Sequence, residues 1–295
     1  MEKLLAFATE LQAQGGGSAN PPPPSNPQNL DTSVLDHIFG SNPADEMRHA
    51  MDGIEDESVP LDQKEIAFDN LEMLVEQIDN ANNLKPLQMW PRLLKQLDSP
   101  EPSLRKLTAW VIATAVQNNP RSQNDLIEND GLTKLFASLD KEDSDEAKNK
   151  ILYAITSELK HNEPGVLALD NIENAWDQLD AILTLKHSNM TKRVIFFFNS
   201  LLIQDDKSKQ VLLEKAKSYS FTDKVYQFAL QHSADEDCVA KALHTLALFF
   251  RYHIIVSDVN GLVQSVKEFQ TIYPEIFTTE EWKSFHDSLE KSLNH

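Results

Sequence analysis

The residue types that could do chemistry are scattered along this 295-residue chain and form no catalytic or metal-binding motif. None of the nine histidines has the HxxxH or HExxH spacing that puts two ring nitrogens on one helical turn. The nearest pair at helical spacing, His244 and His253, is too far apart for one turn. The single cysteine, Cys238, falls in an apolar helical pattern, where a small buried thiol is the ordinary interpretation. We therefore expect no metal, no cofactor and no enzymatic reaction.

Two further patterns that could bind ions or nucleotides also fail. The acidic run DKEDSDEAKNK at 140–150 is similar to a calcium loop only in charge, since Asp145 stands where the sharp turn needs glycine. Residues 54–295 contain three glycines, too few and too far apart for a GxxxxGK[ST] or GxGxxG loop. The chain itself is not expected to bind a nucleotide.

Polar and basic side chains gather instead near the ends of predicted helices. These candidate partner-binding residues are Asp79, Asn80, Ala81, Asn82, Asn83, Asn118, Asn119, Arg121, Lys150, Lys192 and Arg193. Asparagines at helix ends ordinarily satisfy backbone groups that lack a helical partner. Capping explains one or two amides at each end but not runs of five to seven polar residues. Capping alone, and capping combined with partner recognition, both stay open.

The elements that must position these residues are helices. Apolar residues recur at i, i+3, i+4 and i+7 in 71–78, 194–202 and 239–247, with weaker versions near 104–117 and 150–160. Aligning the five segments selects the inner positions Met73, Thr114, Ser157, Ser200 and Thr245, at intervals of 41, 43, 43 and 45 residues. A period in the forties built from two or three helices is typical of armadillo or HEAT repeats.

We therefore predict an all-α, right-handed armadillo superhelix of about four to five repeats, whose concave inner face is lined by the last helix of each repeat. Prolines between the segments begin or end helices, and Gly131 suits a helix C-cap. The predicted organisation is an amphipathic segment at 1–14, a Gly/Pro-rich flexible linker at 15–29, acidic cap helices at 30–58, armadillo repeats at 59–270 and a C-terminal cap helix at 271–295.

Composition limits the classes of partner. The chain has 46 acidic against 27 basic residues, a net charge of −19, which disfavours nucleic acid and anionic membranes. No apolar run approaches the ~20 residues of a membrane helix, and the opening MEKLLAFATELQ lacks the features of a secretory signal. One cysteine fits a reducing compartment. We expect a cytosolic protein, and leave a nuclear pool open.

A threaded peptide is a poor fit for the predicted inner face. Armadillo proteins that hold extended peptides carry an asparagine at each inner position and a tryptophan one turn earlier. None of the inner positions here is Asn, and the preceding turn supplies one Trp among Asp69, Trp110, Tyr153, Phe196 and Lys241. We expect a folded partner instead. In the triplet 196–198, helical spacing turns two phenylalanines to the core, and Phe196 stays open between core and contact.

At this point the sequence resembles a known family. AFDNLEMLVEQIDNANNL (67–84), LQMWPRLLKQL (87–97) and WVIATAVQNNPRSQNDLIENDGLTKL (110–135) closely resemble the Fes-one family of fungal nucleotide exchange factors. The opening MEKLL and KILYAITSELKHN (150–162) agree as well. The match is specific over roughly 60–162 and thins over 163–295, where the Phe-rich 196–198 departs from the smaller residues of the family.

The resemblance implies a co-chaperone that binds the nucleotide-binding domain of cytosolic heat-shock protein 70. The repeats would wrap its second lobe and displace the other, so that ADP leaves, ATP rebinds and client is released. It further implies partner contacts at Ala81 and Arg193. It also suggests that the leading segment, with Leu4, Leu5, Phe7 and Leu11, visits the chaperone's substrate-binding site; a frayed tail is the alternative. We expect a monomer when free. The alternative function is an armadillo scaffold or adaptor that binds another folded protein without affecting nucleotide.

Overall fold

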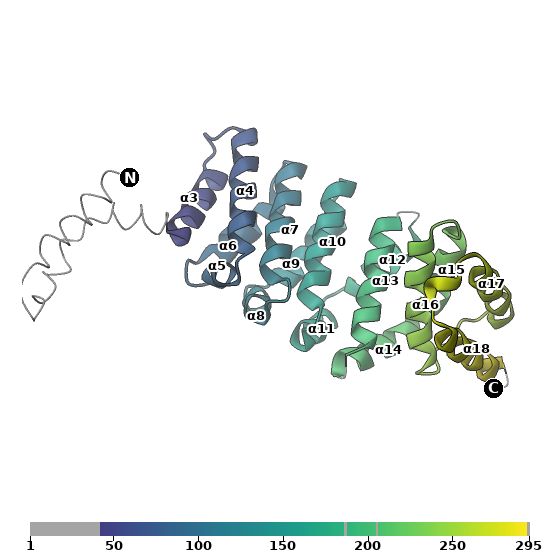
Figure 1. Ribbon diagram of the computed structural model, residues 1–295. Coiled ribbons are helices and arrows are strands. Elements are labelled where there is room, and N and C mark those ends of the chain that lie inside the picture. The colour runs from purple at the N-terminus through teal and green to yellow at the C-terminus, as the bar shows by residue number, and fades with distance from the viewer. Residues whose placement is uncertain (1–41, 186–187, 205, 294–295) are drawn as a thin grey trace, which may run out of the picture. The chain divides into compact units, whose positions relative to one another are not determined.

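The computed structural model describes residues 42–185, 188–204 and 206–293, and every regular element in these ranges is a helix (Figure 1). The candidate client-release residues Leu4, Leu5, Phe7 and Leu11 lie outside them. The helices are α3 (Pro43–Glu55), α4 (Leu61–Val75), α5 (Ile78–Asn83), α6 (Met89–Lys95), η2 (Gln96–Asp98), α7 (Pro102–Val116), α8 (Pro120–Glu128), α9 (Gly131–Lys141), α10 (Asp145–Leu159), α11 (Glu163–Leu169), α12 (Ala175–Thr184), α13 (Ser188–Leu202), α14 (Lys207–Tyr219), α15 (Phe221–Gln231), α16 (Glu236–Phe250), α17 (Val259–Ile272), η3 (Pro274–Ile276) and α18 (Thr279–Leu293).

The described helices form four successive three-helix repeats, α5–α7, α8–α10, α11–α13 and α14–α16, with α3 and α4 before them and α17 and α18 after. The third helices and α4 contact one another in chain order, and we call α4, α7, α10, α13 and α16 the inner column (Figure 1). The five aligned residues, Met73, Thr114, Ser157, Ser200 and Thr245, lie one on each of these helices. The all-α armadillo superhelix predicted from the sequence period is therefore confirmed.

Local sequence explains where many of these helices begin. The side chains of Ser144, Asp235 and Asp258 accept hydrogen bonds from backbone N–H groups in the first turns of α10, α16 and α17. Prolines stand in the first turns of α7, α8 and α11, where the missing N–H costs nothing. The repeats are thus separated by signals that are local in the sequence.

A left-handed residue precedes the second helix of every repeat. Gln88, Asp130, Asn174 and Ser220 have φ values of 55°, 56°, 59° and 53° directly before α6, α9, α12 and α15. The predicted C-cap at Gly131 is therefore wrong by one residue, since Asp130 makes the turn and Gly131 begins α9. A Cβ at Gly131 would lie 2.2 Å from Leu126 Cδ1, so the glycine serves the close packing of α8 against α9.

One hydrophobic core runs through the repeats and joins their layers. Phe197 and Phe198 are buried, as the helical spacing predicted, and Phe196 is 50% exposed. The ring centroids of Phe198 and Phe221 lie 4.7 Å apart and connect α13 to the start of α15. Cys238 belongs to the same core, and burial raises the pKa of its thiol to about 11.

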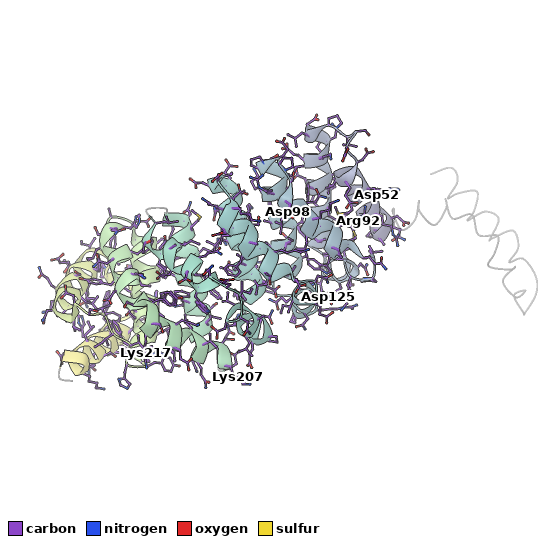
Figure 2. The ribbon with its side chains drawn as sticks, turned by 180° about the vertical axis from the view of Figure 1, so that it is seen from behind. Asp52, Arg92, Asp98, Asp125, Lys207 and Lys217 are labelled. Atoms are coloured by element: carbon purple, nitrogen blue, oxygen red, sulfur yellow. The ribbon has the colours of Figure 1, made fainter. Side chains whose placement is uncertain are left out.

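Ion pairs connect helices that are distant in sequence. The Arg105 guanidinium makes two hydrogen bonds to the buried Glu142 carboxylate, at 2.6 and 2.7 Å, and thereby links α7 to the junction between α9 and α10 in the next repeat. Arg92 on α6 pairs with Asp52 and Glu55 on α3, at 2.6 and 2.5 Å; Asp52 and Arg92 are labelled in Figure 2. Among the helices described, none is long and apolar enough to cross a membrane.

Candidate partner-binding site

Stacked cations and aromatic rings mark the middle of the inner column. The Lys150 ammonium lies 3.5 Å from the centroid of the Trp110 ring, and the Arg193 guanidinium carbon lies 4.5 Å from that of Tyr153. Both distances fall within the reach of a cation–π interaction. We call Trp110, Lys150, Tyr153, Arg193 and Phe196 the cation–aromatic row. Its members come from three successive third helices, α7, α10 and α13.

Both cations of the row are partly desolvated. Burial lowers the pKa of Arg193, and burial together with the nearby Arg193 charge lowers that of Lys150. Within the ranges that the structure describes, no carboxylate lies in ion-pair distance of either side chain, and Arg193 Nε is buried without a hydrogen-bond partner. The Nε atom is out of reach of an incoming group, so a carboxylate could pair only with the accessible part of either cation.

A small pocket of about 110 Å³ opens beside the row. Arg193, Phe196 and Tyr153 line it together with Gln117 and Asn118, which follow α7. The Tyr153 hydroxyl donates to Gln117 Oε1 at 3.1 Å, which fixes the ring on which the guanidinium rests. The structure thus brings Lys150, Arg193 and Asn118, three of the residues predicted from the sequence, into one region.

Two of the aligned inner positions make hydrogen bonds between helices of the column. The Thr114 hydroxyl donates to Glu72 Oε1 at 2.7 Å, and the Asn199 amide donates to the Thr245 hydroxyl at 3.4 Å. These bonds connect α7 to α4 and α13 to α16. The threonines at the aligned positions therefore bond to neighbouring helices of the column.

Ala81, which the resemblance marked as a partner contact, is buried. Its side chain is 2% exposed and belongs to the core between α5 and its neighbours. In the free protein Ala81 therefore contributes to packing, and the partner contact implied by the resemblance stays a prediction. The helical pattern hid this outcome because α5 is short, only Ile78–Asn83, and has no periodicity to identify its buried side.

Several predicted amides bond within the fold. The Asn119 side chain accepts from Ser122 N at 3.4 Å as the N-cap of α8 and is buried. Asn80 donates to the Leu74 carbonyl at 3.0 Å, and Asn82 accepts from the Ser122 hydroxyl at 3.4 Å. Capping and linking explain these three asparagines.

The remaining predicted residues lie at the surface in different places. Asp79 on α5 and Arg121 in the first turn of α8 are exposed, and Asn83 is half-buried. Lys192 points away from the row's cations to Asp237 on α16, 3.1 Å away. Adjacent residues on a helix face different directions, so Lys192 and Arg193 do not form one basic site.

Sequence reasoning did not include Trp110, Tyr153 and Phe196 among the site residues. A signal for them was present, because these three residues are spaced 43 apart, as are Lys150 and Arg193. That interval equals the repeat period, which places all members of each set on the same side of successive inner helices. The sequence alignment places these three rings one turn before the inner positions, but their spacing alone does not show that cations lie beside them.

One buried acid stands apart from this site. Glu158, near the end of α10, is fully buried; its Oε1 accepts from Asn162 Nδ2 at 2.9 Å, and its Oε2 has no hydrogen-bond partner. Burial raises the pKa of this carboxyl to about 9, so it is protonated at neutral pH. Among the described residues, no group of three or more His, Cys, Asp or Glu side chains gathers as a metal site would require.

Solved structures similar to this chain support the fold. A designed armadillo repeat protein in complex with the peptide (KR)4 aligns with a TM-score of 0.65 at 15% identity, over 85% of this chain and all of the designed one. Computationally designed armadillo repeat proteins for modular peptide recognition align with a TM-score of 0.63 at 16% identity, over 83% of this chain and 98% of that one.

Sequence comparisons give the family. The family "Nucleotide exchange factor Fes1" matches residues 1–84, and the "SIL1/FES1/HPBP1 C-terminal domain" matches residues 80–232. The protein named Hsp70 nucleotide exchange factor fes1 of Schizosaccharomyces pombe is 68% identical over 98% of this chain and 100% of its own length. Its namesake in Eremothecium gossypii is 31% identical over 93% of this chain and 94% of its own. The resemblance found in the sequence is confirmed: the chain belongs to the Fes1 family of nucleotide exchange factors.

Proposed function

We propose that this protein is an exchange factor that binds the nucleotide-binding domain of heat-shock protein 70 and promotes ADP release. Two relatives that match nearly the whole chain carry the name of this activity. The observation that supports the binding surface is the cation–aromatic row, in which Lys150 and Arg193 are partly desolvated and have no carboxylate within ion-pair distance among the described residues. The protein performs no covalent chemistry.

The row is suited to a carboxylate on the chaperone. A guanidinium that rests on Tyr153 keeps its planar fork available for two parallel hydrogen bonds. Charge-assisted hydrogen bonds contribute about 1.5–3 kcal/mol each. Because the rings already restrict both cations, little side-chain entropy remains to be lost on binding.

Exchange follows from binding linkage. If the inner column holds the nucleotide-free chaperone more tightly than the ADP-bound form, ADP affinity must fall by the same factor. A thousandfold faster release requires about 4 kcal/mol of differential interaction. Two or three charge-assisted contacts that form only with the open chaperone account for an effect of this size.

The activity is tested by stopped-flow release of a fluorescent ADP analogue from heat-shock protein 70. Saturating protein should accelerate release, and the double variant Lys150→Ala/Arg193→Ala should lose most of the acceleration. The matched control is Lys217→Ala, an exposed cation on α14 that is labelled in Figure 2. Full acceleration by the double variant would place the contact elsewhere. An unchanged release rate with the wild-type protein would leave a scaffold or adaptor that binds without exchange.

The leading segment at 1–14 has a proposed second task. Joined through the linker at 15–29, it would reach the substrate-binding site of the chaperone and help to release clients; fifteen linker residues extend to about 50 Å. Deleting residues 1–29 should then leave ADP release intact and slow client release. Equal client release by both forms would show that the segment is a passive tail.

The proposal also covers the oligomeric state, the cellular compartment and the domain organisation. We propose a cytosolic protein that is monomeric when free, with acidic cap helices at 30–58, repeats at 59–270 and a C-terminal cap at 271–295. Sedimentation of the free protein tests the monomer, and fractionation of cells tests the compartment.

A further inference from the structure

The first helix of the inner column carries an exposed apolar side chain at the position where α10 and α13 carry cations. Met73 on α4 is 66% exposed and Ile66 is 51% exposed. Single exposed hydrophobics are ordinary, but these two lie seven residues apart on one face of the same helix, about 10 Å along its axis. The exposed face of α4 is therefore more apolar than a single exposed side chain would make it.

The repeat register makes the change explicit. Counting back from Met73 and Ser157, the place of Lys150 on α10 is taken by Ile66 on α4. The place of Tyr153 is likewise taken by Asp69. On α10 the two positions hold a cation and an aromatic ring. On α4 the same two positions hold an aliphatic side chain and an acid.

Ile66 and Met73 border a groove of about 670 Å³ between α3 and α4. Apolar atoms come from Ala50 on α3 and from Ile66, Ala67, Met73 and Leu74 on α4. Glu46 and His49 on α3 and Gln63 and Asn70 on α4 complete the lining, so the groove combines aliphatic and polar side chains.

The surroundings of the groove are strongly acidic. Residues 43–76 carry eleven acids and two bases, and one of these bases, Arg48, is already paired with Asp45 at 2.5 Å. On α4, Asp62 and Asp69 are exposed beside the aliphatic stripe. A field of this sign attracts cations and repels other acidic surfaces, including most of this chain itself.

We propose that the groove between α3 and α4 binds a basic amphipathic helix of a partner protein. An aliphatic stripe two turns long matches the i, i+3, i+4, i+7 face of such a helix, whose flanking lysines or arginines would meet the acids. Strand addition is the other common mode, and it needs a sheet edge, which the described part of this chain lacks. The proposal concerns chemistry opposite to that of the cation–aromatic row and does not rest on the exchange function.

A pair of labelled synthetic peptides tests the proposal with the full-length protein. Both peptides have fourteen residues with leucines on one helical face. The first carries lysines on the other face, and the second carries glutamates at the same positions. Fluorescence anisotropy should show that the lysine peptide binds at least tenfold more tightly than the glutamate peptide, with a preference that shrinks as salt rises.

Variants place the binding on the groove. The double change Ile66→Ser/Met73→Ser should lower affinity for the lysine peptide at least tenfold and leave the melting temperature nearly unchanged, because both side chains are exposed. The matched control is Ile203→Ser/Ile272→Ser, which removes two side chains of similar exposure, 61% and 60%, one directly after α13 and one at the end of α17. Equal affinity for both peptides, no binding of either, or equal loss in the two double variants would overturn the proposal.

Discussion

The Lys150 ammonium lies over the Trp110 ring, 3.5 Å from its centroid, although the two residues belong to different repeats. The contact joins the third helices α7 and α10 on the side where Arg193 continues the row over Tyr153. Aromatic rings thus orient these two cations, as carboxylates do in most ion pairs. They fix the direction of a cation and leave its charge available to a partner.

Replacing Trp110 by leucine should weaken partner binding while the fold survives. Trp110 is half-buried, so leucine keeps much of its packing but removes the ring face under Lys150. A cation–π interaction contributes about 0.5–2 kcal/mol, so affinity for heat-shock protein 70 should fall roughly two- to thirtyfold. Titration calorimetry measures this, and Trp110→Phe should recover part of the loss. Equal affinities for the leucine and phenylalanine variants would show that the ring face has no role.

Replacing Ala81 by arginine should unfold the first repeat instead of blocking a docking surface. The side chain is 2% exposed, and an unpaired charge buried there costs about 3–5 kcal/mol. The helical circular dichroism signal of Ala81→Arg should melt at a clearly lower temperature than that of the wild type. Asp79→Arg, on the exposed side of the same short helix, is the control and should melt normally. A normal melting curve for Ala81→Arg would mean that this side of α5 is open.

Two adjacent asparagines should separate capping from recognition. Asn119→Ala removes the N-cap of α8 and should lower the free energy of unfolding by about 1–2 kcal/mol, with exchange unchanged at temperatures where the variant is folded. Asn118→Gly should slow ADP release and leave the free energy of unfolding nearly unchanged, since Asn118 is exposed, lines the pocket beside Arg193 and has a φ of 53°, which glycine also adopts without strain. Denaturant unfolding and ADP-release rates, measured on both variants, decide the matter. Loss of exchange in Asn119→Ala alone would contradict this assignment.

Glu158 should make the protein less stable as pH rises through neutrality. Its folded-state pKa, about 9, lies above the ordinary value of 4.5, so the folded protein holds a proton that the unfolded chain has released. The resulting stabilisation is complete below pH 4.5 and is lost progressively as pH approaches 9, with a slope of up to about 1.4 kcal/mol per pH unit.

The neutral isostere isolates this effect. Glu158→Gln keeps an oxygen that can accept from Asn162 and cannot ionise. Its melting temperature should exceed that of the wild type increasingly from pH 6 to pH 8.5, whereas the two should converge near pH 5. Parallel curves over this range would show that the carboxyl titrates normally.

The fold was accessible from the sequence because its determinants repeat. The apolar spacing recurs every 41–45 residues, and each aligned residue, from Met73 to Thr245, lies on its own helix of the inner column. Junction details were less accessible. Four different residue types, Gln88, Asp130, Asn174 and Ser220, adopt the same left-handed conformation, so no glycine marks the turn.

The site was accessible only in part. The sequence identifies Arg193 and Lys150, but the position of a charge in the sequence does not show which groups it contacts. Lys192, next to Arg193, pairs with Asp237 and is not part of the cation–aromatic row. Asparagine has the same ambiguity, since Asn119 is a buried cap and Asn118, one residue earlier, is exposed beside the pocket. Three-dimensional packing assigns these roles, and residue type alone does not.

The 43-residue spacing of Trp110, Tyr153 and Phe196 limits how this chain can change in evolution. Inserting one residue within α10 or α13 turns everything after it on that helix by about 100° and moves a ring out of line with its neighbours. These helices should therefore tolerate substitutions at many positions where they do not tolerate insertions or deletions. Length variation among descendants should accumulate at the junctions between helices, and the third helices should stay constant in length.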